Sequence, residues 1–150
     1  MLLTEYQDMN EHELLSAMRE QFPNMLTQVA DGDSFFFVPG EAELMFPFAT
    51  LIRHDDAYEV FSQLNRPGVY RLNMGVGKAR LRALVAESGH HDFTALDTLM
   101  PHPTYGPAGW LCILNPGAGT FETLRTLLAT AYGRSEQRAG RRATIDTPDS

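Results

Sequence analysis

The sequence predicts an α+β fold: a single two-layer domain with a mainly antiparallel sheet of about five strands and the N- and C-terminal helices on one face. Three observations lead to this prediction. Amphipathic helical patterns stand near both ends of the chain. Short apolar runs typical of strands lie between them. Most of the turns that join these runs are too short for the crossovers that parallel strands need.

The composition agrees with one folded domain. The chain has 150 residues, and its 43% apolar residues against 21% charged ones are enough for a hydrophobic core. The net charge is −7, and the four arginines of residues 134–150 face three carboxylates, so the excess negative charge lies in residues 1–133. An acidic body argues against nucleic-acid binding, which usually needs a basic face.

Cysteine usage and the first residues indicate a cytoplasmic protein. Cys112 is the single cysteine, so an intrachain disulfide is excluded. Residues 1–10 have neither the basic segment nor the apolar run of a signal peptide, and no stretch reads as a membrane span. We therefore expect no membrane contact, and a monomer or a small homo-oligomer.

The first predicted elements are a helix over residues 10–23 and two strands within residues 25–40. Asn10 and Glu13 have the spacing of a capping box, and Pro23 ends the helix. The apolar stripe of this helix consists of Leu14, Met18 and Phe22.

Gly32 supplies the turn between the two strands because glycine accepts a positive φ. Phe35 and Phe36 point to opposite faces, so the second strand has two apolar faces and is expected inside the sheet. A further strand is predicted over residues 48–53.

The middle of the chain predicts a short helix, a strand and another helix. The helix spans residues 55–65, where Tyr58, Phe61 and Leu64 recur every three residues and Asp56 and Glu59 have capping spacing. The strand spans residues 69–74 and alternates cleanly, and the next helix spans residues 78–88. Residues 90–100 predict one more short helical turn.

The last elements are a strand over residues 110–114 and a helix over residues 120–133. Thr120 caps this helix and Gly133 stops it. The domain is therefore assigned to residues 1–133, and residues 134–150 to a flexible, arginine-containing tail. The buried stripe of the helix consists of Phe121, Leu124, Leu127, Leu128 and Ala131.

The most distinctive stretch is residues 99–116, which holds four prolines, the only tryptophan and the only cysteine. Prolines on both sides of His102 restrict the backbone, so His102 and Tyr105 are presented rigidly ahead of Trp110. This suits a binding loop. It equally suits a stiff connection into a strand, with Trp110 in the core.

Arg71 and Asn73 share one face of the predicted strand 69–74, opposite its apolar residues. If the proline-rich loop covers that face, His102 and Tyr105 would lie over the guanidinium and the amide and form a polar pocket. The alternative is an ordinary solvated sheet face. The candidate ligand-binding residues are thus Arg71, Asn73, His102, Tyr105 and Trp110.

Two further motifs are weaker candidates, one for anion binding and one for metal binding. Gly75, Gly77 and Lys78 stand between a strand and a helix, where backbone N–H groups could hold an anion, but the P-loop spacing is missing and a plain turn explains them equally. The histidines at 90 and 91 with Asp92 match no zinc spacing, and a solvated loop explains them. We expect no metal and no cofactor.

Several sequence segments resemble a bacterial protein family known only as a domain of unknown function, DUF6194. They are "MFPFATL", "LNRPGVYRLNMGVGK", "DFTALDTLMPHPTYGPAGWLCILNP" and "TFETLRTLLATAY", which span most of residues 11–133. The order of elements is more distantly similar to MmcQ/YjbR-like proteins, which have a CyaY-like α+β fold. That second resemblance implies DNA binding, which the acidic body does not support.

The sequence therefore favours a non-catalytic binding module for a small molecule or a protein partner. Nucleic-acid binding by analogy with YjbR-like proteins is the alternative. An enzyme ranks last because no catalytic residue set stands out, and Cys112 lies in an apolar strand.

Overall fold

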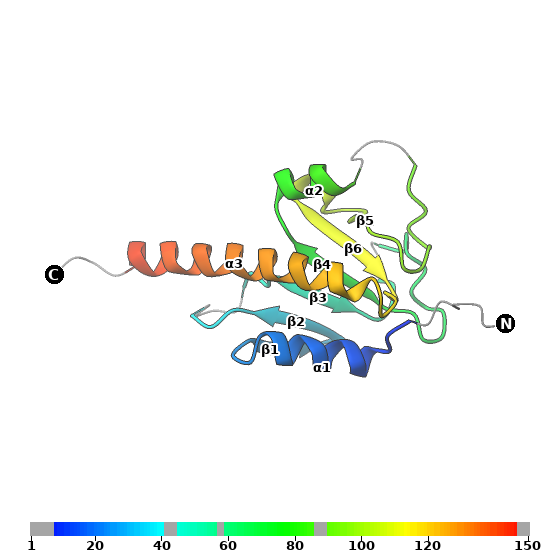
Figure 1. Ribbon diagram of the computed structural model, residues 1–150, viewed down its shortest axis with the longest axis horizontal. Helices are drawn as coiled ribbons and strands as arrows, with labels where there is room; N and C mark the ends of the chain where they lie inside the picture. Colours follow the sequence, from blue (N-terminus) through cyan, green and yellow to red (C-terminus); the bar gives the residue numbers. More distant parts are fainter. Residues whose placement is uncertain (1–7, 41–44, 57–58, 86–89, 147–150) are drawn as a thin grey trace.

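The structure is a computed structural model that describes residues 8–40, 45–56, 59–85 and 90–146, with side chains described as far as residue 141. Figure 1 shows a sheet with two long helices lying along it. The six described strands are all antiparallel, in the order β1-β2-β3-β4-β6-β5. Their bounds are β1 Leu26–Ala30, β2 Asp33–Phe37, β3 Ala49–Ile52, β4 Arg71–Gly75, β5 Met100–Pro101 and β6 Trp110–Leu114.

The helices of the described residues are α1 Glu11–Gln21, α2 Lys78–Leu84, α3 Phe121–Asp146 and the short 3₁₀ turn η1 Gly106–Ala108. The predicted capping box is confirmed, since Asn10 and Glu13 each accept the other's backbone N–H. The predicted buried stripes of α1 and α3 are both confirmed. The α+β prediction is therefore correct, with one strand more than the five expected.

The hydrophobic core lies between one face of the sheet and the helices α1 and α3. Strand register places the alternate residues Phe36, Ala49, Met74 and Leu111 side by side across four strands. They pack with Leu14 and Met18 of α1 and with the leucines of α3 in one continuous cluster. Because α1 and α3 cover the central strands of this face, a binding site on the sheet is expected at its edges or on the opposite face.

The hairpin β1-β2 forms as its turn residues predict. Asp31 and Gly32 both have positive φ, 53° and 84°, which is the turn that matches the twist of antiparallel strands. β2 pairs with β1 on one side and β3 on the other, so its expected position inside the sheet is correct. This hairpin fixes Phe35 on the face away from the helices.

Two predicted helices are absent from the described residues. Residues 55, 56 and 59–65 form turns and irregular backbone instead: the carboxylate of Asp56 accepts the N–H of Glu59, and Asp56 donates its own N–H to the carbonyl of Glu59. Phe61 is exposed, and Tyr58 lies outside the described residues.

The second predicted helix that is absent from the described residues is the short helical turn within residues 90–100. Residues 90–99 are a loop, and the two-residue strand β5, which the sequence did not predict, begins at Met100. Residues 86–88, at the end of the predicted helix 78–88, lie outside the described residues.

The helix α3 does not stop at Gly133, so the predicted helix end is wrong. Gly133 has no positive φ, and the turns after it make contacts that favour continuation. Ser135 and Ala139 are buried, Arg134 donates to the carbonyl of Gly75, and Arg138 lies over the ring of Phe46. The flexibility of residues 134–150 stays a prediction. No helix among the described residues is long and apolar enough to cross a membrane.

Candidate functional site

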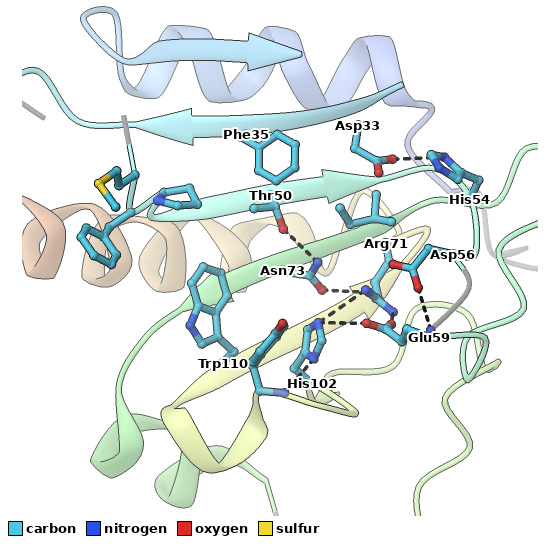
Figure 2. Close-up of a pocket in the computed structure, with 15 residues that line it drawn as sticks. Asp33, Phe35, Thr50, His54, Asp56, Glu59, Arg71, Asn73, His102 and Trp110 are labelled. Carbon is cyan, nitrogen blue, oxygen red and sulfur yellow. Dashed lines mark hydrogen bonds and ion pairs between the residues drawn. The ribbon is translucent and has the colours of Figure 1, made fainter. Parts of the chain in front are cut away.

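A cavity of about 660 Å³ lies on the sheet face opposite to α1 and α3. Figure 2 shows it in front of the strands, with these helices behind the sheet. All five residues predicted to bind a ligand line it, together with groups from β2, β3 and the loop after β3. The other lining residues are Asp33, Phe35, Met45, Phe46, Pro47, Thr50, Ile52, His54, Asp56 and Glu59.

Strand alternation builds the floor of the cavity. The residues that alternate with the core positions, Phe35, Thr50 and Asn73, lie side by side across β2, β3 and β4. Ile52 and Arg71 form the next row. Beyond them a small second cluster of Leu64, Met100, Cys112 and Leu114 fills the rest of this face, so the cavity is confined to the middle of the sheet.

Arg71 carries a buried charge at one end of the floor. Its side chain is 3% exposed. The guanidinium donates through Nη1 to a carboxylate oxygen of Glu59 and to the hydroxyl of Ser62 (3.0 Å), and through Nε to Oδ1 of Asn73 (2.9 Å). Removing a guanidinium from water costs free energy that only such partners offset. Glu59, which follows β3 in the chain, therefore supplies the counter-charge that allows an arginine on this face.

Asn73 continues the network toward the centre of the sheet. It accepts from Arg71 through Oδ1, and its Nδ2 donates to the hydroxyl of Thr50 at 2.9 Å. Arg71, Asn73 and Thr50 are all at most 9% exposed. The alternative prediction of a solvated sheet face is therefore wrong for Arg71 and Asn73, because both side chains are buried.

The backbone holds the ring of His102 in place. Nδ1 accepts the N–H groups of Thr104 and Tyr105, both at 3.0 Å, in the turn that follows β5. Nε2 lies 3.4 Å from Nη2 of Arg71 and 3.9 Å from Oε2 of Glu59. Burial, with the positive charge of Arg71 nearby, lowers the pKa of His102 to about 3. His102 is therefore neutral near pH 7.

The aromatic rim of the cavity consists of three exposed or half-buried lining residues, Phe46, Tyr105 and Trp110. The ring of Tyr105 stands 5.0 Å from that of His102, yet the residue is 58% exposed. Trp110 is half-buried and lies against Gly75, where a Cβ would come within 3.1 Å of the indole. Met45 and Phe46 are exposed on the other side. Such a rim favours ligands with a flat apolar part.

Gly75 ends β4, Lys78 begins α2 and Gly77 lies between them, and none of the three lines the cavity. The N–H of Gly77 donates to the carbonyl of Gly109 at 3.0 Å, and a Cβ on Gly77 would come within 2.9 Å of the Arg134 side chain. The N–H of Gly77 is therefore already used, and its positive φ of 95° together with the nearby Arg134 side chain explains this glycine. Anion binding by Lys78 stays a prediction.

Sequence reasoning missed Glu59, Ser62 and Thr50. Glu59 and Ser62 were placed on a helix, although their loop lies beside Arg71. Thr50 could have been found, because it alternates with the apolar residues of β3 and pairs with Asn73 across the sheet.

Cys112 and the described His, Asp and Glu side chains do not have the features expected of a catalytic thiol or of a metal site. Burial raises the pKa of the Cys112 thiol to about 12, with Glu59 adding to the effect and Arg71 opposing it. This agrees with its interpretation as a buried apolar residue. Within the described part of the chain, no three His, Cys, Asp or Glu side chains are grouped so that they could hold a metal ion.

Comparison with known proteins gives one result. No curated protein and no solved structure matches the chain. The model of a family of unknown function, DUF6194, matches residues 9–144, which extends beyond the predicted boundary at 133 and includes most of α3. The chain therefore belongs to the DUF6194 family.

Proposed function

We propose that the chain is a binding module that takes a small molecule into the cavity on the open face of the sheet. The observation that supports this most is the buried Arg71 network directly beneath an aromatic rim. A cavity with apolar walls and a few fixed polar groups is the usual form of a small-molecule site. Its volume of about 660 Å³ lies within the range of such sites.

Binding without turnover is the favoured form of this proposal. A general base works best when its pKa is near the working pH. The pKa of His102 is far below that range, and its Nδ1 already accepts two backbone hydrogen bonds. Glu59 holds the guanidinium of Arg71 in place. These groups are arranged to fix a polar floor, which serves recognition.

The test is a ligand screen with the full chain. Trp110 is the only tryptophan and lines the cavity, so a bound compound should change its fluorescence and raise the melting temperature. Tyr105→Ala should weaken a confirmed compound about 3- to 10-fold, the loss expected for one aromatic contact.

Val60→Ala is the matched control. Val60 is 59% exposed, close to the 58% of Tyr105, but does not line the cavity. We expect this variant to bind as the wild type does and both variants to unfold normally. A broad metabolite library in which no compound changes the fluorescence or the melting temperature would contradict the proposal.

A relationship to MmcQ/YjbR-like proteins, a bacterial source and a cytoplasmic location are proposals of the same kind. Nucleic-acid binding, which accompanies that relationship, is less favoured because Arg134 and Arg138 are already engaged by Gly75 and Phe46. A gel shift at low salt that weakens as salt rises would support it, since phosphate contacts are strongest at low salt.

A further inference from the structure

The hydrogen position on His102 follows from its backbone contacts. Nδ1 accepts two N–H groups, from Thr104 and Tyr105, so it cannot itself carry a hydrogen. A neutral imidazole has one N–H, and it must then be on Nε2. Nε2 is therefore a hydrogen-bond donor, and it faces Arg71 and Glu59 rather than the backbone.

The nearest polar atom to Nε2 is also a donor. Nη2 of Arg71 lies 3.4 Å away, and a guanidinium has no acceptor. Oε2 of Glu59 lies 3.9 Å from Nε2, beyond hydrogen-bond distance. Among the described residues, neither Nη2 nor Nε2 has a hydrogen-bond acceptor.

These two donors belong to buried side chains that both line the cavity. The side chains of Arg71 and His102 are each 3% exposed, and both line the cavity. Figure 2 shows the His102 ring beside the guanidinium of Arg71. Buried donors without an acceptor are rare because they cost free energy. One oxygen atom with two lone pairs, as in a carbonyl, can accept from both.

The charge of the cavity lining indicates whether the accepting oxygen belongs to an anion or to an uncharged group. Three carboxylates, from Asp33, Asp56 and Glu59, line the cavity, against the single guanidinium of Arg71, which Glu59 already neutralises. An anionic ligand would meet this excess of negative charge in the cavity lining. An uncharged carbonyl oxygen would not.

The aromatic residues of the cavity indicate what kind of molecule carries this carbonyl oxygen. Phe46, Tyr105 and Trp110 of the rim and Phe35 of the floor line the cavity with aromatic rings, and flat ligands pack well against such rings. Because this argument assumes a bound small molecule, it rests on the proposed function. We propose that the cavity takes an uncharged, flat aromatic molecule whose carbonyl oxygen accepts hydrogen bonds from both Arg71 Nη2 and His102 Nε2.

Three probes of one ring system test the inference by calorimetry on the full chain. 2-Quinolone has the carbonyl, quinoline lacks it, and quinoline-2-carboxylate carries a charge. 2-Quinolone should bind at least tenfold more tightly than either of the others. Equal binding of quinoline, or tighter binding of the carboxylate, would overturn the inference while the proposed function stands, because the cavity would still be occupied.

A lack of binding by all three probes would also overturn the inference. The proposed function would then be judged separately, by the metabolite screen and the Tyr105→Ala variant. The two failures are therefore distinguishable.

A variant and a spectrum add tests that separate the donor from the fold. In His102→Asn, the amide oxygen can accept the backbone N–H groups as Nδ1 does, but the Nε2 donor is lost. The preference for 2-quinolone over quinoline should fall to about threefold or less, because only 2-quinolone has the carbonyl oxygen that accepts from Nε2. In ¹⁵N spectra of the wild type, His102 should carry its hydrogen on Nε2 at neutral pH. A hydrogen on Nδ1 would overturn the inference even if the variant does not fold.

Discussion

The two faces of the sheet are built from the same strands but in different ways. On the face covered by α1 and α3, Leu51 and Leu72 are fully buried among apolar side chains. One residue away along the strands, Thr50 and Asn73 point to the other face and belong to a hydrogen-bonded network under a cavity. The covered face is closed by helices, whereas loops close the cavity face only in part.

The difference shows which interactions each face depends on. The covered face is stabilised by burial of apolar area, which needs only residues of suitable size and hydrophobicity. The cavity face keeps a buried charge that is acceptable only while Glu59, Ser62 and Asn73 remain in place. The first face should therefore respond to changes in volume and the second to changes in charge and hydrogen bonding.

The largest effect is expected on the covered face. Leu72→Ala should lower the free energy of unfolding by about 3 to 5 kcal/mol, because it leaves a cavity in a closed core. Urea denaturation measures this loss, and Val60→Ala, at an exposed position, should change it by less than about 0.5 kcal/mol. A loss of under about 1 kcal/mol for Leu72→Ala would show that this face can collapse around a void.

A smaller loss is expected when the charge pair of the cavity face is broken. Glu59→Gln should cost about 2 to 3 kcal/mol, less than a fully buried pair, because the Glu59 side chain is 16% exposed. A second change, Arg71→Met, should restore part of this loss, since it removes the uncompensated guanidinium. Urea denaturation of the two single variants and the double variant gives the coupling energy between Glu59 and Arg71. Purely additive losses of unfolding free energy would contradict this prediction.

The smallest effect is a dependence on pH that belongs to the cavity face alone. The pKa of His102 is about 3 in the folded chain, against 6.5 as the ordinary value. Above about pH 6.5, His102 is neutral in both the folded and the unfolded chain, and stability has its full value. As the pH falls from 6.5 toward 3, only the unfolded chain binds a proton on His102, so the free energy of unfolding decreases.

Between pH 7 and pH 5 the wild type should lose about 2 kcal/mol more unfolding free energy than His102→Asn, which has no such proton. Urea denaturation at the two pH values measures the difference. The carboxylates that His102 faces, above all Glu59, are common to both chains, so their titration largely cancels. Equal pH dependence of the two chains would show that His102 is already protonated at pH 5 in the folded state.

The contrast between the faces also explains how much could be predicted from the sequence. The stripes of α1 and α3 and the apolar side of each strand follow from periodicity, because the partner of an apolar side chain need not be identified. Arg71 and Asn73 were placed on the correct face for the same reason. Their ligand-binding role stays a prediction.

The partners of the polar groups could not be predicted in that way. Glu59 reaches Arg71 from a loop that only the tertiary structure brings there, and its spacing to Asp56 imitated a helix cap. The end of α3 was wrong for a related reason. Gly133 is typical of a helix end, but contacts of Arg134 and Ala139 with distant residues outweigh that local preference.

The length of α3 has a consequence for how the chain tolerates shortening. Arg138 lies over Phe46, so the last turns of this helix support one wall of the cavity on the far side of the sheet. The leucines that fill the core stand in the first turns. Proteolytic trimming from the C-terminus would therefore reach the wall of the cavity before it reached those leucines, and could alter what the protein recognises while most of its core remained intact.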